Sequence, residues 1–138
     1  MAEGRAHDLY ALLVDAAAQD HDREVLQKHV GRAEETAGLI EHRLHMAVAD
    51  RARGVLHTLE GEFEQAEVRL QCALEGFSAY PAPWQIGRTL HEMGELAKAQ
   101  GGIERARDYY SQALNAFEGL RAAPYVERTR AALAALGG

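Results

Sequence analysis

The sequence of 138 residues predicts an all-α fold, in which about three helical hairpins stack as a solenoid and a C-terminal helix caps them. Two observations lead to this prediction. The segment GVLHTLEGEFEQAEVRLQCALEGF, residues 54–77, returns forty residues later as GELAKAQGGIERARDYYSQALNAF, residues 94–117. In both copies the apolar residues follow steps of 3 and 4, the spacing of one helix face. A hairpin that cannot bury this face alone buries it by stacking on its neighbours.

The first hairpin, residues 5–37, is a degenerate copy of this unit. Leu26, Val30 and Ala33 keep the steps of 4 and 3, whereas Val14 and His21 stand where the later copies have glycine. A terminal repeat has a neighbour on only one side, which explains such degeneracy. The helices expected along the chain span residues 5–19, 22–37, 41–59, 62–78, 83–100, 103–119 and 123–136.

The second and third hairpins, residues 41–78 and 83–119, carry glycine at two matching places. Gly54 and Gly94 lie inside the first helix of each hairpin, where glycine costs about 1 kcal/mol relative to alanine, so we expect close approach of a partner helix. The second glycine of each copy ends that helix in a left-handed turn. The residues that define the repeat are Gly54, Gly61, Ala66, Ala73, Gly94, Gly101, Ala106, Tyr110 and Ala113.

The last helix, residues 123–136, has no partner in the sequence and is expected to cap the stack. Together the three hairpins and this helix make a single domain over residues 1–138, a length at which one core buries about two thirds of the unfolded chain's surface. The three prolines are expected in loops. They are Pro81, Pro83 and Pro124.

The segment LHEMGELAKAQGGIERARDYYSQALNAF, residues 90–117, resembles the tetratricopeptide repeat (TPR) family, with both glycines, the paired alanines and the aromatic residue in place. The usual aromatic of the first helix is matched only loosely by Trp84, and the step of forty exceeds the family's usual ~34 residues. With APYVERTRAAL at 123–133, the chain resembles the C-terminal TPR tails of bacterial transcription regulators and of signalling cyclases and ATPases. The resemblance implies a TPR-like α-solenoid that serves as an adaptor or regulatory module.

The composition of the chain excludes several classes of partner and site. The net charge of −6 argues against nucleic-acid and anionic-membrane partners, which require excess positive charge. A single cysteine, Cys72, excludes an internal disulfide and a cysteine-based zinc site, and we expect it to be buried as a small apolar residue. No apolar run approaches the ~18 residues of a membrane span, and the N-terminus lacks a secretory core, so a cytoplasmic location is expected.

Catalytic motifs are missing from the sequence, which contains no Gly-rich phosphate loop and no nucleophile elbow. We therefore predict no enzyme activity, no catalytic residues and no cofactor. His42 and His45 in EHRLH lie one helical turn apart, the spacing of two metal ligands, but a third ligand is not defined. Surface histidines are the more common explanation, and no metal site is predicted.

The resemblance implies that the first helices of the hairpins line a concave face that binds peptides. Helical geometry assigns charged and apolar residues of three first helices and of the last helix to this face. Its arginines suit bidentate binding of carboxylates, so an acidic peptide or partner helix is the expected ligand. The alternative is a solvated charged face, with Arg88 and Lys98 paired to glutamates of their own helix. The predicted partner-binding residues are Arg51, Val55, Arg88, His91, Glu95, Lys98 and Arg128.

Asp50 and Arg53 stand where the next copy has the apolar Leu90 and Met93. One interpretation is an ion pair between positions i and i+3 of one helix. The other is a polar opening toward a ligand or a neighbouring domain.

Three functions agree with these observations. The first is a protein-interaction scaffold that binds its partner on the concave face. The second is the regulatory, effector-sensing tail of a larger signalling protein. The third is a self-association module, a homodimer that pairs through an apolar face left open at the N-terminal end.

Overall fold

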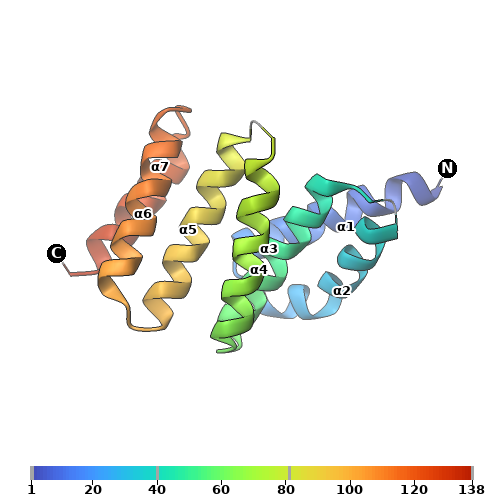
Figure 1. Cartoon of the computed structure of the whole chain (residues 1–138), viewed down its shortest axis with the longest axis horizontal. Coiled ribbons are helices and arrows are strands. Elements are labelled where there is room, and N and C mark those ends of the chain that lie inside the picture. The colour runs from blue at the N-terminus through green and yellow to red at the C-terminus, as the bar shows by residue number, and fades with distance from the viewer. Residues whose placement is uncertain (1, 40, 81, 138) are drawn as a thin grey trace. The chain divides into compact units, whose positions relative to one another are not determined.

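The structure is a computed structural model that describes residues 2–39, 41–80 and 82–137, with side chains from Asp8 onward. These residues form seven α-helices and no strand, which confirms the predicted all-α fold (Figure 1). Each observed helix begins and ends within a few residues of the predicted one. The helices are α1 (Ala2–Gln19), α2 (Arg23–Leu39), α3 (Arg43–Leu59), α4 (Phe63–Ser78), α5 (Pro83–Ala99), α6 (Ile103–Glu118) and α7 (Ala123–Ala135).

The prolines were expected in loops, but two of them lie in the first turns of helices. Pro83 is the first residue of α5, and Pro124 is the second residue of α7. The backbone N–H groups of a helix's first turn have no partner within the helix, so proline loses nothing there and its fixed φ favours the helix. The third, Pro81, lies outside the described residues.

The chain divides into two compact units, residues 1–76 and 77–138. In the first unit, α1, α2 and α3 pack against one another, and α4 contacts α3. In the second unit, α6 packs against α5 and α7. The boundary between the units lies near the end of α4. No described helix is long and apolar enough to cross a membrane.

Gly54 and Gly94, the helical glycines of the repeat, mark places where two helices approach closely. A Cβ atom on Gly54 of α3 would lie 2.7 Å from Leu70 Cδ2 of α4, and one on Gly94 of α5 would lie 2.6 Å from Tyr110 Cδ1 of α6. Real Cβ atoms do not approach other carbon atoms this closely, so only glycine permits these helix pairs. The repeated sequence thus encodes a repeated packing contact.

Small and aromatic residues fill the space between the helices of each hairpin. In the second unit, Tyr110 packs with Ala97 and Ala106 in a core. Cys72 was expected to be buried with the apolar residues of α4, but it is exposed. The spacing along the helix alone did not distinguish its position from that of the buried Ala73. The four repeat-defining alanines, Ala66, Ala73, Ala106 and Ala113, are all 0% exposed.

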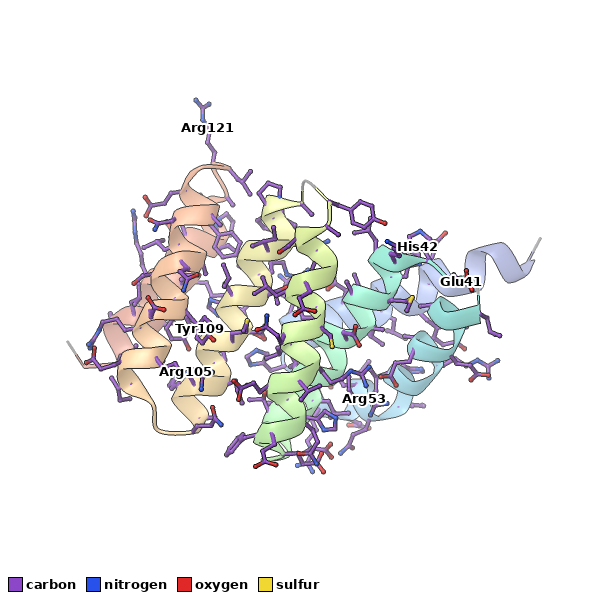
Figure 2. The ribbon with its side chains drawn as sticks, viewed as in Figure 1. Glu41, His42, Arg53, Arg105, Tyr109 and Arg121 are labelled. Carbon is purple, nitrogen blue, oxygen red and sulfur yellow. The ribbon has the colours of Figure 1, made fainter. Side chains whose placement is uncertain are left out.

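Left-handed turns recur at the hairpin tips. Gly61 and Gly101 have φ values of 76° and 81°, and His21, at the matching place in the first hairpin, has a φ of 53°. Glu41 and Arg121 have φ values of 51° and 55°, and Figure 2 shows them in the turns that precede α3 and α7. Residues with a Cβ are strained by about 1–2 kcal/mol in this conformation. Gly61 and Gly101 avoid this strain, whereas His21, Glu41 and Arg121 retain it.

Replacement of Gly101 by alanine is expected to destabilise the protein by about 1 kcal/mol, because a Cβ is unfavourable at positive φ. No other atom lies within 4 Å of that Cβ, so the effect would come from the backbone alone. Urea unfolding of Gly101→Ala would measure it. Gly31→Ala is the matched control, because Gly31 lies inside α2 with open space around it, and there alanine should stabilise by about 0.5–1 kcal/mol. Two changes of the same sign would contradict this explanation.

Candidate functional site

The predicted partner-binding residues fall into two groups that belong to different units. Arg51 and Val55 lie on α3 in the first unit, and the other five lie on α5 and α7 in the second unit. Each group is therefore described within its own unit.

The α3 group is buried. Arg51 is 0% exposed, and its Nη2 donates a hydrogen bond of 2.8 Å to Asp15 Oδ1 of α1. Val55 is 3% exposed. These two residues contribute to the interior of the first unit, and a partner that touched Arg51 would have to displace it from Asp15.

Two arginines of the second group lie against one aromatic ring of α7. Arg88 of α5 is 5% exposed, and its guanidinium carbon lies 5.9 Å from the ring centroid of Tyr125 in α7. The guanidinium carbon of Arg128, one turn later on α7, lies 5.5 Å from the same centroid. Burial raises the pKa of the Tyr125 hydroxyl, and the positive charges of the two arginines oppose this only in part. The phenol therefore stays neutral at physiological pH.

Next to this ring, a buried histidine connects α5 with α7. His91 is 2% exposed, its Nδ1 lies 3.0 Å from Thr129 Oγ1, and its Nε2 lies 3.3 Å from Glu95 Oε1. Tyr110 of α6 completes the group, with its ring centroid 5.3 Å from that of His91. Burial raises the pKa of the Tyr110 hydroxyl, and the negative charge of Glu95 raises it further, so this hydroxyl keeps its proton.

The accessible part of this group lies at its edges. Lys98, in the last turn of α5, is exposed, and Glu95 and Arg128 are half-buried. We call the set of Arg88, His91, Glu95, Tyr125, Arg128 and Thr129 the α5–α7 polar cluster. The positive charge of Arg128 and the negative charge of Glu95 both lie at its accessible edge, with hydrogen-bonding groups inside. Of these side chains, the arginine is the one suited to binding a carboxylate.

Tyr125 and Thr129 are functional candidates that the analysis of the sequence missed. They lie four residues apart on α7, with Arg128 between them, and both are buried at 7% and 0% exposure. The sequence does show that Tyr125 and Thr129 share one face of a helix, because they are four residues apart. Nothing in it showed that α7 would bring this face against the charged residues of α5.

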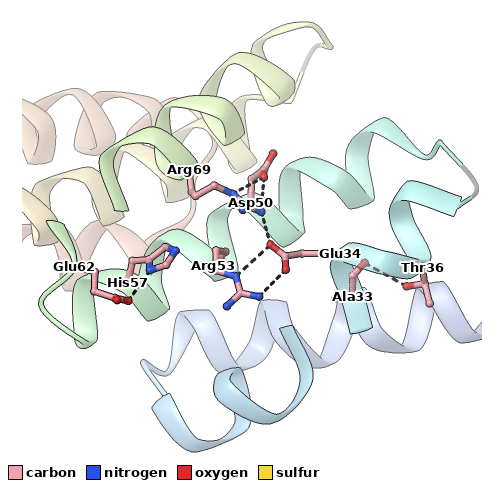
Figure 3. A network of polar contacts seen from close by, with 8 residues as sticks. All are labelled: Ala33, Glu34, Thr36, Asp50, Arg53, His57, Glu62 and Arg69. Carbon is pink, nitrogen blue, oxygen red and sulfur yellow. Dashed lines mark hydrogen bonds and ion pairs between the residues drawn. The ribbon is translucent and has the colours of Figure 1, made fainter. Parts of the chain in front are cut away.

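Asp50 and Arg53 do not form the pair within α3 that one interpretation predicted; each binds another helix. Arg53 donates two hydrogen bonds to Glu34 of α2, from Nε at 3.2 Å and from Nη2 at 2.6 Å. Arg69 of α4 donates from Nε to Asp50 at 2.9 Å and from Nη2 to Glu34. Figure 3 shows the resulting chain of four residues, which we call the α2–α3–α4 ion network.

Burial raises the pKa of both carboxylates of this network, but their net pKa shifts are opposite. Burial by itself raises the pKa of Glu34, but its bonds to Arg53 and Arg69 outweigh burial and the net pKa is lowered. For Asp50, burial is the larger effect, and Arg69 only partly offsets the rise in pKa. Glu34 is therefore the residue whose ionised form stabilises the fold.

Glu34→Gln is expected to destabilise the protein by about 2 kcal/mol at pH 7, because hydrogen bonds to charged groups contribute about 1.5–3 kcal/mol. The pKa of Glu34 is lower in the folded state than its unfolded value of about 4.3, so its contribution is fully present above that pH. It is lost as the pH falls through the folded pKa. Urea unfolding of both proteins at several pH values should show their difference shrinking below about pH 4.

The neighbouring Glu35→Gln is the control for this experiment, because Glu35 is exposed and its replacement should change stability by less than about 0.5 kcal/mol. A difference between the parent and Glu34→Gln that stayed constant down to pH 3 would show that ionised Glu34 is not what stabilises the network.

The two histidines of EHRLH act locally at the start of α3. His42 is its N-cap residue, and its Nδ1 accepts a hydrogen bond of 3.2 Å from the backbone N–H of His45. The rings are stacked with centroids 3.8 Å apart, and His45 Nε2 lies 3.4 Å from Asp8 Oδ1. Among the described residues, no three His, Cys, Asp or Glu side chains are grouped as a metal site.

Comparison with known proteins adds one match. A family model described as tetratricopeptide repeat matches residues 45–119. The match begins in the first turn of α3 and ends just after α6, so it covers both copies of the repeated sequence. A search of curated proteins finds no match.

Proposed function

Because this chain belongs to the tetratricopeptide repeat family, whose repeats generally mediate protein–protein interactions, we propose that it is a non-catalytic interaction scaffold. Its partner is an acidic peptide or partner helix, and the α5–α7 polar cluster with Lys98 is the binding face. One observation carries the proposal. Two arginines from different helices lie against the same buried tyrosine ring, and one of them, Arg128, is only half-buried.

The parts of this face have different roles in the proposed binding. Lys98 and Arg128 are at the edge, where a carboxylate of the partner can reach them. Arg88 and Tyr125 are buried, and Arg128 lies over the Tyr125 ring. The contact of 3.0 Å between His91 Nδ1 and Thr129 Oγ1 links α5 with α7 and helps to fix their spacing. A preorganised face loses less entropy when a peptide binds, so the same contacts give higher affinity.

The test uses a fluorescently labelled peptide of alternating glutamate and leucine, and the same peptide with glutamine for glutamate. We expect the acidic peptide to bind more tightly, and the double variant Lys98→Gln/Arg128→Gln to lose about tenfold in affinity, equal to 1.4 kcal/mol. Fluorescence anisotropy measures both, and circular dichroism checks that the variants stay helical. Binding should also weaken as salt is added, because the charges at the edge are exposed.

A matched control separates this face from the effect of net charge. Lys28→Gln/Arg43→Gln removes the same two charges from exposed positions in the first unit, and its affinity should equal that of the parent. If both double variants lose affinity equally, or if neither does, the α5–α7 polar cluster is not the binding face.

A further inference from the structure

Trp84 extends the proposed binding face by one helical turn. Along α5 it precedes Arg88, His91 and Glu95 by steps of 4, 3 and 4, which place the four side chains on one side of the helix. Trp84 is the single tryptophan of the chain, and at 38% exposure its ring is open to solvent. The α5–α7 polar cluster therefore continues into an exposed aromatic ring at the end where α5 begins.

Two aromatic rings from other helices hold Trp84 in place. Its ring centroid lies 4.9 Å from that of Tyr125 in α7 and 5.5 Å from that of Phe117 in α6. Both contacts are edge-to-face, an arrangement that aromatic pairs prefer. Tyr125 and Phe117 are buried, so Trp84 alone of these three rings is exposed. A ring that is already fixed loses little rotamer freedom when a partner binds it.

The charges around the Tyr125 ring decide which kind of side chain suits the indole. The guanidinium carbons of Arg128 and Arg88 lie 5.5 Å and 5.9 Å from the Tyr125 centroid. The negative charge of Glu92 also acts on the Tyr125 hydroxyl, but there the two positive charges outnumber it. An exposed indole accepts either a cation or an apolar side chain. Because the arginines disfavour a cation here, an uncharged apolar side chain is the better complement.

We propose that the partner of the α5–α7 polar cluster carries a large apolar side chain close to an acidic one, and that Trp84 binds the apolar side chain. The Trp84 ring centroid and the Arg128 guanidinium carbon lie 4.9 Å and 5.5 Å from the Tyr125 centroid, so one short peptide segment reaches both. This inference rests on the proposed function, because it adds a specificity-determining residue to the same face.

The spacing of the two partner residues follows from the geometry of an extended peptide. Such a chain advances about 3.3 Å per residue, and its side chains alternate between two sides. Residues two positions apart therefore point the same way at a separation of about 7 Å. We assign this spacing to the apolar residue that contacts Trp84 and the acidic residue that binds Arg128.

The test uses the fluorescence of Trp84 itself, since the chain has no other tryptophan. The probe is a serine-rich heptapeptide with blocked ends, leucine at its centre and glutamate two residues to either side, so both chain directions give the same spacing. We expect it to shift the Trp84 emission to shorter wavelengths and to protect the ring from quenching by acrylamide. Titration calorimetry should show that serine in place of leucine weakens binding about tenfold, and that lysine there weakens it at least as much.

Trp84→Ala and Ile103→Ala are the matched protein variants. Ile103 is also exposed, at 39%, and it begins α6, whereas Phe117 lies near the end of that helix. Trp84→Ala should abolish the preference for the leucine peptide over the serine peptide, and Ile103→Ala should retain it. The comparison of the peptides on the parent protein does not depend on how well either variant folds.

The outcomes separate this inference from the proposed function. Equal affinities of the parent for the leucine and serine peptides, or binding that leaves the Trp84 emission unchanged, would overturn this inference alone. So would tighter binding of the lysine peptide than of the serine peptide, because the indole would then receive a cation. If the leucine peptide binds no better than its counterpart with glutamine for glutamate, the proposed binding of acidic peptides is wrong, and this inference is wrong with it.

Discussion

Gly94→Val should destabilise the protein by about 3 kcal/mol, the upper part of the range for an overpacked core. The first atom of the new side chain would lie 2.6 Å from Cδ1 of Tyr110, a ring that is 0% exposed. That ring is enclosed by Ala97 and Ala106 and cannot move aside without opening the contact between α5 and α6. Valine also stiffens the unfolded chain and is a slightly better helix former than glycine, but these gains amount to only a few tenths of a kcal/mol.

Equilibrium unfolding in urea would measure this effect, with Gly31→Val as the control. Gly31 also lies inside a helix, but nothing stands within 4 Å of its would-be Cβ, so the same substitution should change stability by less than about 0.5 kcal/mol. Equal effects at the two glycines would mean that helix propensity, and not the approach of α6, explains glycine at 94.

Asp15→Ala is expected to have a similarly large effect, about 3 kcal/mol, through charge and not through shape. It removes the carboxylate that lies 2.8 Å from the guanidinium of Arg51, a side chain that is 1% exposed. A buried charge that loses its counter-ion is far more costly than an ion pair removed as a whole. The double variant Asp15→Ala/Arg51→Met should therefore be more stable than Asp15→Ala alone, although it lacks one more native side chain.

Thermal and urea unfolding of the three proteins would test this order. Asp8→Ala provides the comparison at the surface, because Asp8 is 56% exposed and its Oδ1 lies 3.4 Å from His45 Nε2, so its loss should cost less than about 1 kcal/mol. A double variant less stable than Asp15→Ala would show that Arg51 contributes through packing and other contacts more than through this pair.

The fold was predictable because the sequence repeats its own packing rules. Gly54 and Gly94 indicate a close contact between two helices. Once one hairpin is recognised, the step of forty residues gives the positions of the later helices. The first hairpin was also placed correctly, although it lacks both glycines. The apolar steps at Leu26, Val30 and Ala33 were sufficient, since all three are buried at 0%, 1% and 3% exposure.

The candidate site was less predictable, because helix periodicity gives a direction around the axis but not the depth of burial. Arg51 and His91 occupy the same place in successive copies and were both assigned to a partner-binding face. In the structure both are buried, at 0% and 2% exposure, and each reaches a side chain of another helix, Asp15 or Thr129. Which polar residues find such partners depends on contacts between helices distant in sequence, and no local pattern records them.

The α2–α3–α4 ion network has a consequence for how the repeats assemble. Two hairpins that share the same packing residues risk exchanging places, either within one chain or between two chains during folding. A hairpin bearing Arg53 in the wrong place would bury charge against apolar residues, a mismatch that disfavours the exchange. We therefore expect the network to favour the native order of the hairpins over an exchanged one. At the corresponding places of the next copy, the four charged residues are replaced by Leu74, Leu90, Met93 and Tyr109.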